Sequence, residues 1–435
     1  MIDLVQLRRE PDFVKAALAR RGVSSSEIDA IIALDVEHRR VLQDAEALRA
    51  QIKELSRQVG EARKDRDVAR AELVAEQSRT LGDEERGASQ TLDVLARELR
   101  DKLLMVPNLP SPEAPDGVDE NDNVELRRWW VGMDQGEPFP TFAEHQRVAH
   151  WDIGAELGIL DMETGVKIAG SMFPLYRGAG SRLLRSLGSF ALNAHVGDYE
   201  EIRPPSFALT ETMMSTGHLP KSADDMYAIE RDDLWAIPTS EVPLTSMHRG
   251  EILDEARLPI RLTAQTACFR REAGAAGRDT RGLLRVHEFD KVELFAYCTP
   301  DQAIDAHADI LARAESLLQA LGLTYRLLDL CAGDLGTSSA RTIDLEVFSP
   351  GVDRWLEVSS VSWFRDFQAR RANVRYRTSD GTTALVHTVN GSALAWARIW
   401  AALVETHHQP DGSVKLPDVL APYMGDALTI TRKVW

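Results

Sequence analysis

Two long stretches near the start of the chain repeat apolar residues every seven positions. The first repeat runs from Leu34 to Val59 and the second from Val74 to Leu99. Their members are Leu34, Val41, Leu48 and Leu55 with Ala45, Ile52 and Val59, and then Val74, Leu81, Ala88 and Leu95 with Leu92 and Leu99. Charged residues fill most other positions, so the spacing predicts two coiled-coil helices.

The segment that joins these two repeats is short. Gly60 is expected to interrupt the first helix, and the connection falls near residues 60–68. Gly82 and Gly87 each cost about 1 kcal/mol relative to alanine inside a helix, so we expect local irregularity there. Two helices of similar length with a short connection predict an antiparallel hairpin arm, which ends before two prolines, Pro107 and Pro110.

The rest of the chain alternates shorter helical and strand patterns. Residues 1–25 predict a short strand or turn followed by a helix, and residues 107–145, rich in proline and acidic residues, predict a linker. From residue 146 onward, helix and strand patterns follow one another to residue 435. We therefore predict an α+β protein with a helical arm domain over 1–106, a linker over 107–145 and a second domain over 146–435.

One stretch in the second domain concentrates charged residues on two predicted strands. It runs from Cys268 to Glu293 and is CFRREAGAAGRDTRGLLRVHEFDKVE. Because side chains two apart on a strand share a face, Arg270 and Glu272 are expected to point the same way. The same holds for a second set, Arg285, Phe289 and Glu293. Guanidinium groups, carboxylates and a ring on one surface suit a nucleoside triphosphate and an amino acid, although a salt-bridged hairpin at a sheet edge has the same pattern.

The overall charge limits how this chain can bind nucleic acid. The 51 basic and 68 acidic residues leave a net charge of −17, which argues against non-specific coating of nucleic acid. Binding of a nucleic acid would then need a local basic surface. One such cluster lies around the predicted tip of the arm and consists of Arg57, Arg63, Lys64, Arg66 and Arg70. Acidic residues are interleaved with it, so a solvated helix face is the alternative.

The sequence has no obvious membrane-targeting segment and no cysteine pattern typical of a metal site. No apolar run approaches the roughly 20 residues that cross a bilayer, and the start of the chain lacks the apolar core of a signal peptide. We expect a cytoplasmic protein with no membrane partner. The three cysteines, Cys268, Cys298 and Cys331, lack metal-ligand spacing.

The pattern FRxE, a loop and then RGLxRxHxFxKxE resembles the second signature motif of class II aminoacyl-tRNA synthetases in its seryl form. The arm, the TSE segment from Thr239 to Glu241, and VNGSALAWARIW are also similar to the bacterial type of seryl-tRNA synthetase. This resemblance covers essentially the whole chain. It implies a class II core with a mixed, mainly antiparallel sheet flanked by helices, and a homodimer built on the helix over 181–195 and the strand after it. It also implies that the arm binds tRNA(Ser).

The resemblance further implies which residues bind ATP and Mg²⁺. Arg270 would contact the α-phosphate and Arg285 the γ-phosphate, while adenine would lie between Phe289 and Arg398. Arg270 and Arg398 are therefore the implied catalytic residues. The full ATP-binding set is Arg270, Arg271, Glu272, Arg285, Phe289, Glu357, Val358, Ser359, Ser360 and Arg398. Glu357 and Ser360 would hold Mg²⁺, for which hard oxygen ligands are suited. An arginine on a surface helix is the ordinary alternative for Arg398.

The implied serine-binding residues are Thr239, Ser240, Glu241, Glu293 and Ser392. Taken alone, the TSE segment is more typical of a helix N-cap with an acidic first turn. Two other carboxylates, Asp344 and Glu346, lie on an alternating strand and are expected to face solvent.

Some positions depart from the family pattern, namely Glu288, Trp363, Phe364 and Ala393. They leave open a paralogue with a specialised role, such as supplying seryl-tRNA to a biosynthetic pathway or resisting an inhibitor. Two further alternatives are an amino acid:carrier-protein ligase and a non-catalytic tRNA-binding regulator. The arm argues against the ligase, and the presence of Arg270, Arg285 and Arg398 argues against the regulator.

Overall fold

The computed structural model describes residues 1–274, 280–425 and 427–432. Within these residues the chain forms two compact units, one over residues 2–107 and one over residues 108–435 together with Met1. The first unit is the helical arm and the second contains the large sheet.

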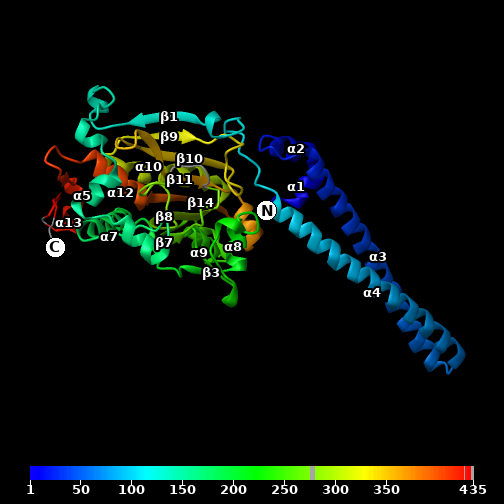
Figure 1. Cartoon of the computed structure of the whole chain (residues 1–435). Helices are drawn as coiled ribbons and strands as arrows, with labels where there is room; N and C mark the ends of the chain where they lie inside the picture. Colours follow the sequence, from blue (N-terminus) through cyan, green and yellow to red (C-terminus); the bar gives the residue numbers. More distant parts are fainter. Residues whose placement is uncertain (275–279, 426, 433–435) are drawn as a thin grey trace. The chain divides into compact units, whose positions relative to one another are not determined.

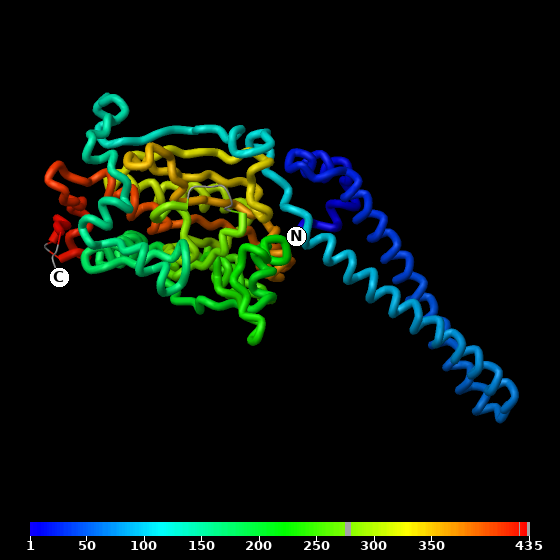
Figure 2. The backbone as a smooth tube through the Cα atoms, viewed as in Figure 1, coloured from blue at the N-terminus to red at the C-terminus, as the bar shows by residue number. Residues whose placement is uncertain are grey.

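The arm unit consists of helices. A capping box starts the longest of them, with Ser24 and Glu27 bonding each other's backbone N–H groups. Figure 2 shows the two long helices running side by side. The bounds are α1 Leu4–Arg9, α2 Pro11–Ala19, α3 Ser25–Lys64 and α4 Val68–Met105. The predicted antiparallel arm is therefore confirmed.

The seam between α3 and α4 follows the predicted heptads. Val41 and Ala45 of α3 and Val74 and Leu99 of α4 are buried, and the other heptad positions are half-buried. Two helices alone cannot enclose their contact from all sides, so part of the apolar stripe stays at the surface.

The glycines in the arm do not break its helices. Gly60 lies inside α3, which continues to Lys64, and α4 runs unbroken through Gly82 and Gly87. Packing across the seam offsets the low helix propensity of these residues, so the predicted interruption and irregularity were wrong. The short strand or turn expected in residues 1–25 was also wrong, because α1 and α2 occupy that region.

One sheet of eight strands organises the second unit, counted over the described residues. The strand order is β1-β9-β10-β11-β14-β8-β7-β2, and Figure 1 shows the strands from β1 to β7 stacked in this order. Neighbours are antiparallel except β2, which is parallel to β7. The bounds are β1 Val124–Trp129, β2 Glu200–Glu201, β7 Ile260–Phe269, β8 Glu288–Cys298, β9 Tyr325–Asp329, β10 Arg341–Ser349, β11 Arg354–Trp363 and β14 His387–Ala395.

The predicted linker contains one edge of this sheet. β1 lies inside residues 107–145 and pairs with β9, for example Trp129 with Tyr325. Its first five residues are exposed and Trp129 is half-buried, so its sequence, VELRRW, lacks the apolar alternation of a half-buried strand. The expectation of a linker over 107–145 therefore has to be revised.

Helices pack on the sheet and share one apolar core with it. The core contains Leu187, Ile310 and Trp400 from three different helices and Leu294 and Leu345 from strands. The helix bounds are α5 His150–Leu157, α6 Met162–Ala169, α7 Ala179–Asn193, α8 Thr210–Thr216, α9 Glu241–Ser246, α10 Ala303–Ala320, α11 Phe367–Ala372, α12 Trp396–Thr406 and α13 Ala421–Met424.

Small sheets complete the unit. Their strands are β3 Phe207–Leu209, β4 Ala228–Ile229, β5 Leu234–Ala236, β6 Ile252–Asp254, β12 Arg375–Arg377, β13 Thr383–Leu385, β15 Val414–Lys415 and β16 Thr429–Ile430. The helix α6 follows α5 directly. Because α12 begins at Trp396, Ala393 and Ala395 lie on β14 and not on the helix that carries Arg398.

Candidate active site

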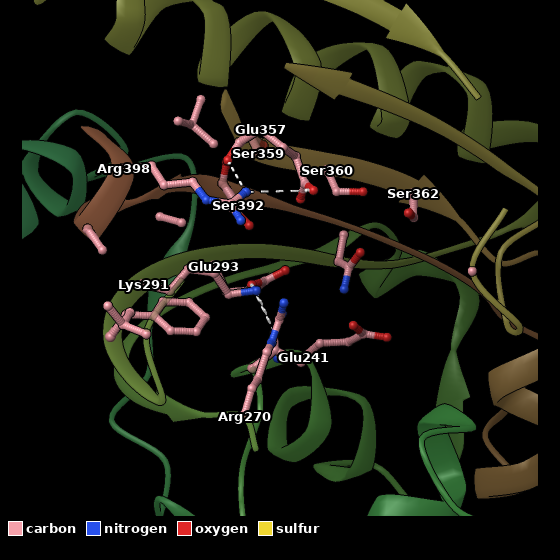
Figure 3. Close-up of a pocket in the computed structure, with 18 of the residues that line it drawn as sticks. Glu241, Arg270, Lys291, Glu293, Glu357, Ser359, Ser360, Ser362, Ser392 and Arg398 are labelled. Atoms are coloured by element: carbon pink, nitrogen blue, oxygen red, sulfur yellow. Dashed lines mark hydrogen bonds and ion pairs between the residues drawn. The ribbon is translucent and has the colours of Figure 1, made fainter. Parts of the chain in front are cut away.

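A pocket of about 520 Å³ opens in the second unit. Its walls come from β8, β11, β14 and the start of α12, together with residues between the end of β7 and the start of β8. A volume in this range suits a small-molecule ligand. Figure 3 shows charged and hydroxyl side chains pointing toward one another across it.

Alternation along β8 explains why this strand is both core and pocket wall. Phe289, Lys291 and Glu293 line the pocket, whereas Val292 and Leu294 belong to the apolar core. Successive strand side chains point to opposite faces. The register with β7, in which Glu293 lies opposite Ala264, keeps the charged face directed at the pocket.

Most residues expected to bind ATP or serine line this one pocket. They are Thr239, Glu241, Arg270, Glu272, Arg285, Phe289, Glu293, Glu357, Val358, Ser359, Ser360, Ser392 and Arg398. In the sequence they are spread from residue 239 to residue 398, so it is the sheet that gathers them.

Two expected residues do not line the pocket. Arg271 is exposed, and its backbone N–H and Nη1 donate to the carbonyl oxygens of Asp225 and Asp224 at 2.8 and 3.3 Å. Ser240 is fully buried, with its Oγ 2.7 Å from Oγ1 of Thr266. Each is a chain neighbour of a residue that faces the pocket, and neighbouring side chains diverge.

The strands are shorter than the sequence predicted. β7 ends at Phe269 and β8 begins at Glu288, so Arg270, Glu272 and Arg285 all lie outside the strands. Their convergence comes from the loop backbone, with Glu272 in a left-handed conformation at φ 50°, and not from strand alternation. Residues 275–279 of the predicted loop lie outside the described residues.

The cationic groups of the pocket have partners within it. Arg285 Nη1 lies 2.6 Å from Glu272 Oε2, and the Arg270 guanidinium carbon is 5.3 Å from the centre of the Phe289 ring. Arg398 donates from Nη1 to the Glu357 carbonyl oxygen at 2.8 Å. Phe289 and Arg398 line the same cavity, as the resemblance implies.

One part of the pocket wall is a cluster of buried polar side chains around Glu293. Lys291 Nζ lies 2.5 Å from Glu293 Oε2 and 2.7 Å from Thr239 Oγ1, which in turn donates to the same carboxylate at 3.1 Å. Glu241 accepts from Gln368 Nε2 at 2.6 Å. Burial raises the pKa of both glutamates, and the Lys291 ammonium opposes that rise.

Sequence reasoning missed Lys291 and His218, which also line the pocket. Lys291 could have been found, because it precedes Glu293 by two residues on a predicted strand and must share its face. His218 carried no comparable signal. Its Nδ1 lies 2.7 Å from Thr216 Oγ1, and burial, with Arg270 and Lys291 nearby, lowers its pKa to about 3. The imidazole is therefore neutral near pH 7.

The TSE segment serves a helix start as well as the pocket. Thr239 Oγ1 accepts from the backbone N–H of Glu241 at 3.2 Å, at the beginning of α9. The helix-start interpretation and the pocket interpretation both hold, since Thr239 and Glu241 also line the cavity.

Side-chain oxygens of the kind that bind metal ions lie at one side of the pocket. Glu357 is half exposed there and only 3.9 Å from Arg398 Nη1, and Ser360 lines the same wall. Among the described residues no group of three or more His, Cys, Asp or Glu side chains could hold a metal. Two protein oxygens still fit Mg²⁺, which binds proteins through one or two carboxylates plus substrate phosphates.

Asp344 does not face solvent as expected. It pairs with Ser360 across β10 and β11, and its Oδ1 has no hydrogen-bond partner among the described residues. Burial raises the pKa of this carboxyl well above its usual value, and the nearby Glu357 and Glu346 raise it further. Glu346 is paired with Arg326 at 2.6 Å, so it is not a free solvent-facing carboxylate either.

The four departures from the family pattern occupy different environments. Phe364 lines the pocket and Ala393 is fully buried in the core. Trp363 donates from Nε1 to His387 Nδ1 at 3.3 Å. Glu288 lies beside Phe289 in a smaller cavity with Asp290. None of them replaces a charged side chain of the pocket.

Comparison with known proteins agrees with this geometry. The seryl-tRNA synthetase N-terminal domain model matches residues 1–110, and the model of the class II core domain of tRNA synthetases (G, H, P, S and T) matches residues 227–407. The serine–tRNA ligase of Thermotoga neapolitana is 44% identical over 428 residues, covering 98% of this chain and 99% of that protein. The chain belongs to the seryl-tRNA synthetase family.

Solved structures of this family superpose over the full chain. A seryl-tRNA synthetase from Pyrococcus horikoshii complexed with ATP is 33% identical, covers 100% of both chains and has a TM-score of 0.88. A cytoplasmic serine–tRNA ligase from Naegleria fowleri in complex with AMP is 26% identical, covers 98% of this chain and 96% of that one, and has a TM-score of 0.84. The predicted class II core is confirmed. None of the described helices is long and apolar enough to span a bilayer.

Proposed function

We propose that this chain is a serine–tRNA ligase, which activates serine with ATP and transfers it to the 3′ end of tRNA(Ser). The observation that carries the proposal is the single pocket in which Arg270, Arg285, Arg398 and Phe289 meet the buried cluster around Glu293. The first four suit a bound nucleotide and the cluster suits a small zwitterion. Full-length similarity to serine–tRNA ligases supports the same assignment.

In the first step, a serine carboxylate oxygen attacks the α-phosphorus of ATP and pyrophosphate leaves. The protein contributes mainly position and charge to such a displacement. Arg270 holds the α-phosphate and stabilises its developing charge, and Arg285 holds the γ-phosphate. Their planar guanidinium groups match phosphate oxygens in two-pronged contacts.

The adenine ring lies between Phe289 and Arg398, and Glu272 accepts a hydrogen bond from its amine. Stacking on an aromatic ring is worth about 1–3 kcal/mol per base. Arg270 lies against Phe289 and Arg285 pairs with Glu272, so the groups assigned to the base and to the phosphates are neighbours in the pocket.

The Glu293 cluster selects serine. Glu293 and Ser392 bind the ammonium and the hydroxyl, and the segment from Thr239 to Glu241 closes this side of the pocket. A site built to bond a hydroxyl rejects alanine strongly, because the partner groups are then left unpaired.

Glu357 and Ser360 would hold Mg²⁺. When bound, the ion neutralises charge on the phosphates of ATP. The Glu357 carboxylate is half exposed, and its one ion pair among the described residues, with Arg398 Nη1 at 3.9 Å, is long, so it is available as a ligand.

In the second step a hydroxyl of the terminal ribose of tRNA attacks the acyl carbon of seryl-adenylate, and AMP leaves. We assign tRNA(Ser) binding to the basic residues near the tip of the arm. Arg63, Lys64, Arg66 and Arg70 are exposed and form no ion pair among the described residues. Arg57 is already bonded to Glu54 and Glu61, so its contribution is smaller.

We also propose a homodimer, because the segment from α7 to β2 resembles the first class II motif. β2 forms an edge of the large sheet, and both its residues are exposed. An enzyme that charges tRNA acts where tRNA is used, so the cytoplasm remains our proposed location.

Serine-dependent exchange of pyrophosphate into ATP tests the first step. Arg270→Ala should lower the rate at least 100-fold, because the α-phosphate loses its charged partner. The matched control is Arg271→Ala, which removes the neighbouring arginine outside the pocket and should leave the rate within about twofold. Rapid exchange by a folded Arg270→Ala variant would contradict the assignment.

The remaining alternatives predict different products. Charging of total tRNA with serine supports the ligase, whereas loading of serine onto a carrier thiol would favour the carrier-protein ligase. Failure to form an adenylate with any of the twenty amino acids would favour a non-catalytic regulator. A specialised paralogue would charge tRNA(Ser) but differ in its response to serine-mimicking inhibitors.

A further inference from the structure

A buried imidazole–carboxylate pair lies behind the pocket and takes no part in the chemistry above. His150, the first residue of α5, and Glu405, in the last turn of α12, are both 0% exposed. His150 Nδ1 lies 2.7 Å from Glu405 Oε1, and the backbone N–H of His150 donates to the same oxygen at 2.9 Å.

The other oxygen of Glu405 is equally occupied. It accepts from the Ser349 hydroxyl and from the backbone N–H of Gly351, the latter at 3.0 Å. Both carboxylate oxygens thus have two donors, which is the arrangement that a buried ionised carboxylate requires. Glu405 is therefore a fixed acceptor toward His150.

The other nitrogen of the imidazole, Nε2, contacts the segment Leu283–Arg285, which ends at the arginine proposed to bind phosphate. The backbone N–H of Leu283 donates to His150 Nε2 at 2.9 Å. Because a backbone amide can only donate, Nε2 is the unprotonated nitrogen. Nδ1 therefore carries the proton and donates a hydrogen bond to Glu405. The carboxylate thus sets both the tautomer and the orientation of the ring.

The backbone around Leu283 is shaped to fit this ring. Gly282 has φ +57°, and a Cβ built there would lie 2.4 Å from His150 Nε2. Only glycine combines this conformation with such a close approach. The residues next to this contact also meet: the guanidinium carbon of Arg281, which precedes Gly282, lies 5.0 Å from the centre of the ring of Trp151, which follows His150.

The segment held in this way ends at the nucleotide-binding groups. Leu283, Leu284 and Arg285 line the pocket, and the Leu284 carbonyl oxygen accepts from Arg398 Nε at 3.1 Å. A continuous series of hydrogen bonds and one covalent segment therefore runs from Glu405 through His150 to both arginines.

We propose that His150, oriented by Glu405, is a positioning residue for ATP: it fixes the Leu283–Arg285 segment and, through Leu284, the guanidinium of Arg398. This inference rests on the proposed function for the identity of the ligand. It assigns a role to two residues that lie outside the pocket.

Two conservative variants separate the two nitrogens of the ring. The amide of His150→Asn mimics Nδ1 and keeps the bond to Glu405, but leaves the Leu283 N–H buried without an acceptor. His150→Gln mimics Nε2 and keeps that acceptor. Without that acceptor the Leu283–Arg285 segment loses the contact that fixes it, so the Kd of ATP, measured by calorimetry, should rise about tenfold or more in His150→Asn and much less in His150→Gln.

The KM values distinguish positioning from general loss of structure. In pyrophosphate exchange, His150→Asn should raise the KM of ATP and leave that of serine within about twofold. An equal rise in both KM values, or unchanged ATP binding in His150→Asn, would overturn the inference. If His150→Asn does not fold, Gly282→Ala perturbs the same contact from the other side and should give the same ATP-specific effect, and its normal ATP binding would overturn the inference too.

The two proposals fail in different ways. A wild-type protein that binds ATP but shows no serine-dependent exchange would contradict the proposed function, and the ATP Kd values of the variants would still decide the role of His150.

Discussion

Arg285 and Glu272 form an ion pair across the two segments that flank the loop between β7 and β8, with Nη1 2.6 Å from Oε2. The side chains are only 23% and 16% exposed, so water screens the pair weakly. In the proposed complex each partner bonds a different end of ATP, Arg285 the γ-phosphate and Glu272 the adenine amine. Each member of the pair is thus assigned a second partner in the nucleotide.

The first prediction separates the two ends of the nucleotide. Arg285→Ala should weaken ATP at least tenfold and leave adenosine almost unaffected, whereas Glu272→Ala should weaken both, because a hydrogen bond to a charged group contributes about 1.5–3 kcal/mol. Equilibrium binding of both ligands measures this. Glu125→Ala, which removes the partner of Arg128 on β1 outside the pocket, is the control. Equal weakening of adenosine by both pocket variants would argue against these roles.

The second prediction concerns Lys291, which is buried against Glu293. Burial raises the Glu293 pKa and Lys291 opposes that rise, so Lys291→Met should raise the pKa further and favour the protonated acid. Because the serine ammonium requires the carboxylate, the KM of serine should increase tenfold or more near neutral pH and fall as the pH rises. Exchange assays between pH 6 and 9 measure this trend. Lys167→Met removes an exposed lysine and should behave as wild type. A pH-independent KM in Lys291→Met would count against the model.

The third prediction compares paired and unpaired basic residues on the arm. Replacing Arg63 and Lys64 by glutamate should raise the KM of tRNA about tenfold or more, because phosphate contacts are lost and like charges are added. Arg57→Ala should have a smaller effect, since its guanidinium is bonded to Glu54 and Glu61. Aminoacylation kinetics at fixed salt measure both effects. Pyrophosphate exchange without tRNA should be unchanged in all these variants, and a loss of exchange would indicate damage to the fold.

The fourth prediction concerns acid stability. His195 is 1% exposed, and burial together with Arg313 lowers its pKa to about 4, although Asp309 and Asp198 oppose this. Between pH 6.5 and 4 the unfolded chain binds a proton that the folded chain does not, so this residue favours unfolding as the pH falls. The His195→Leu variant lacks this titrating group. The difference in free energy of unfolding between His195→Leu and wild type should therefore shift in favour of the variant by up to about 2 kcal/mol from pH 7.5 to pH 5. Urea unfolding at the two pH values tests this, and an equal difference at both would refute it.

Local spacing in the sequence determined the arm and one wall of the pocket. The heptads from Leu34 to Leu99 specify which face of each helix is apolar, and two such faces can be buried against each other without any other part of the chain. In the same way, alternation on β8 places Phe289 and Glu293 on one face. The resemblance to the family motifs then indicated which ligand groups these residues would contact.

Tertiary structure decided what spacing cannot encode. Arg270, Glu272 and Arg285 meet because a loop closes outside the strands, and Arg271 and Ser240 turn away from the pocket although each neighbours a residue that lines it. β1 is a sheet edge only because β9, two hundred residues later, offers it hydrogen bonds.

The bond between His150 and Glu405 joins residues 255 positions apart. Periodicity reports which face of an element is apolar, but it carries no information about which distant donor will meet which acceptor. That pairing follows only when the whole sheet and its helices pack into one core, because burial then forces each polar group to find a partner.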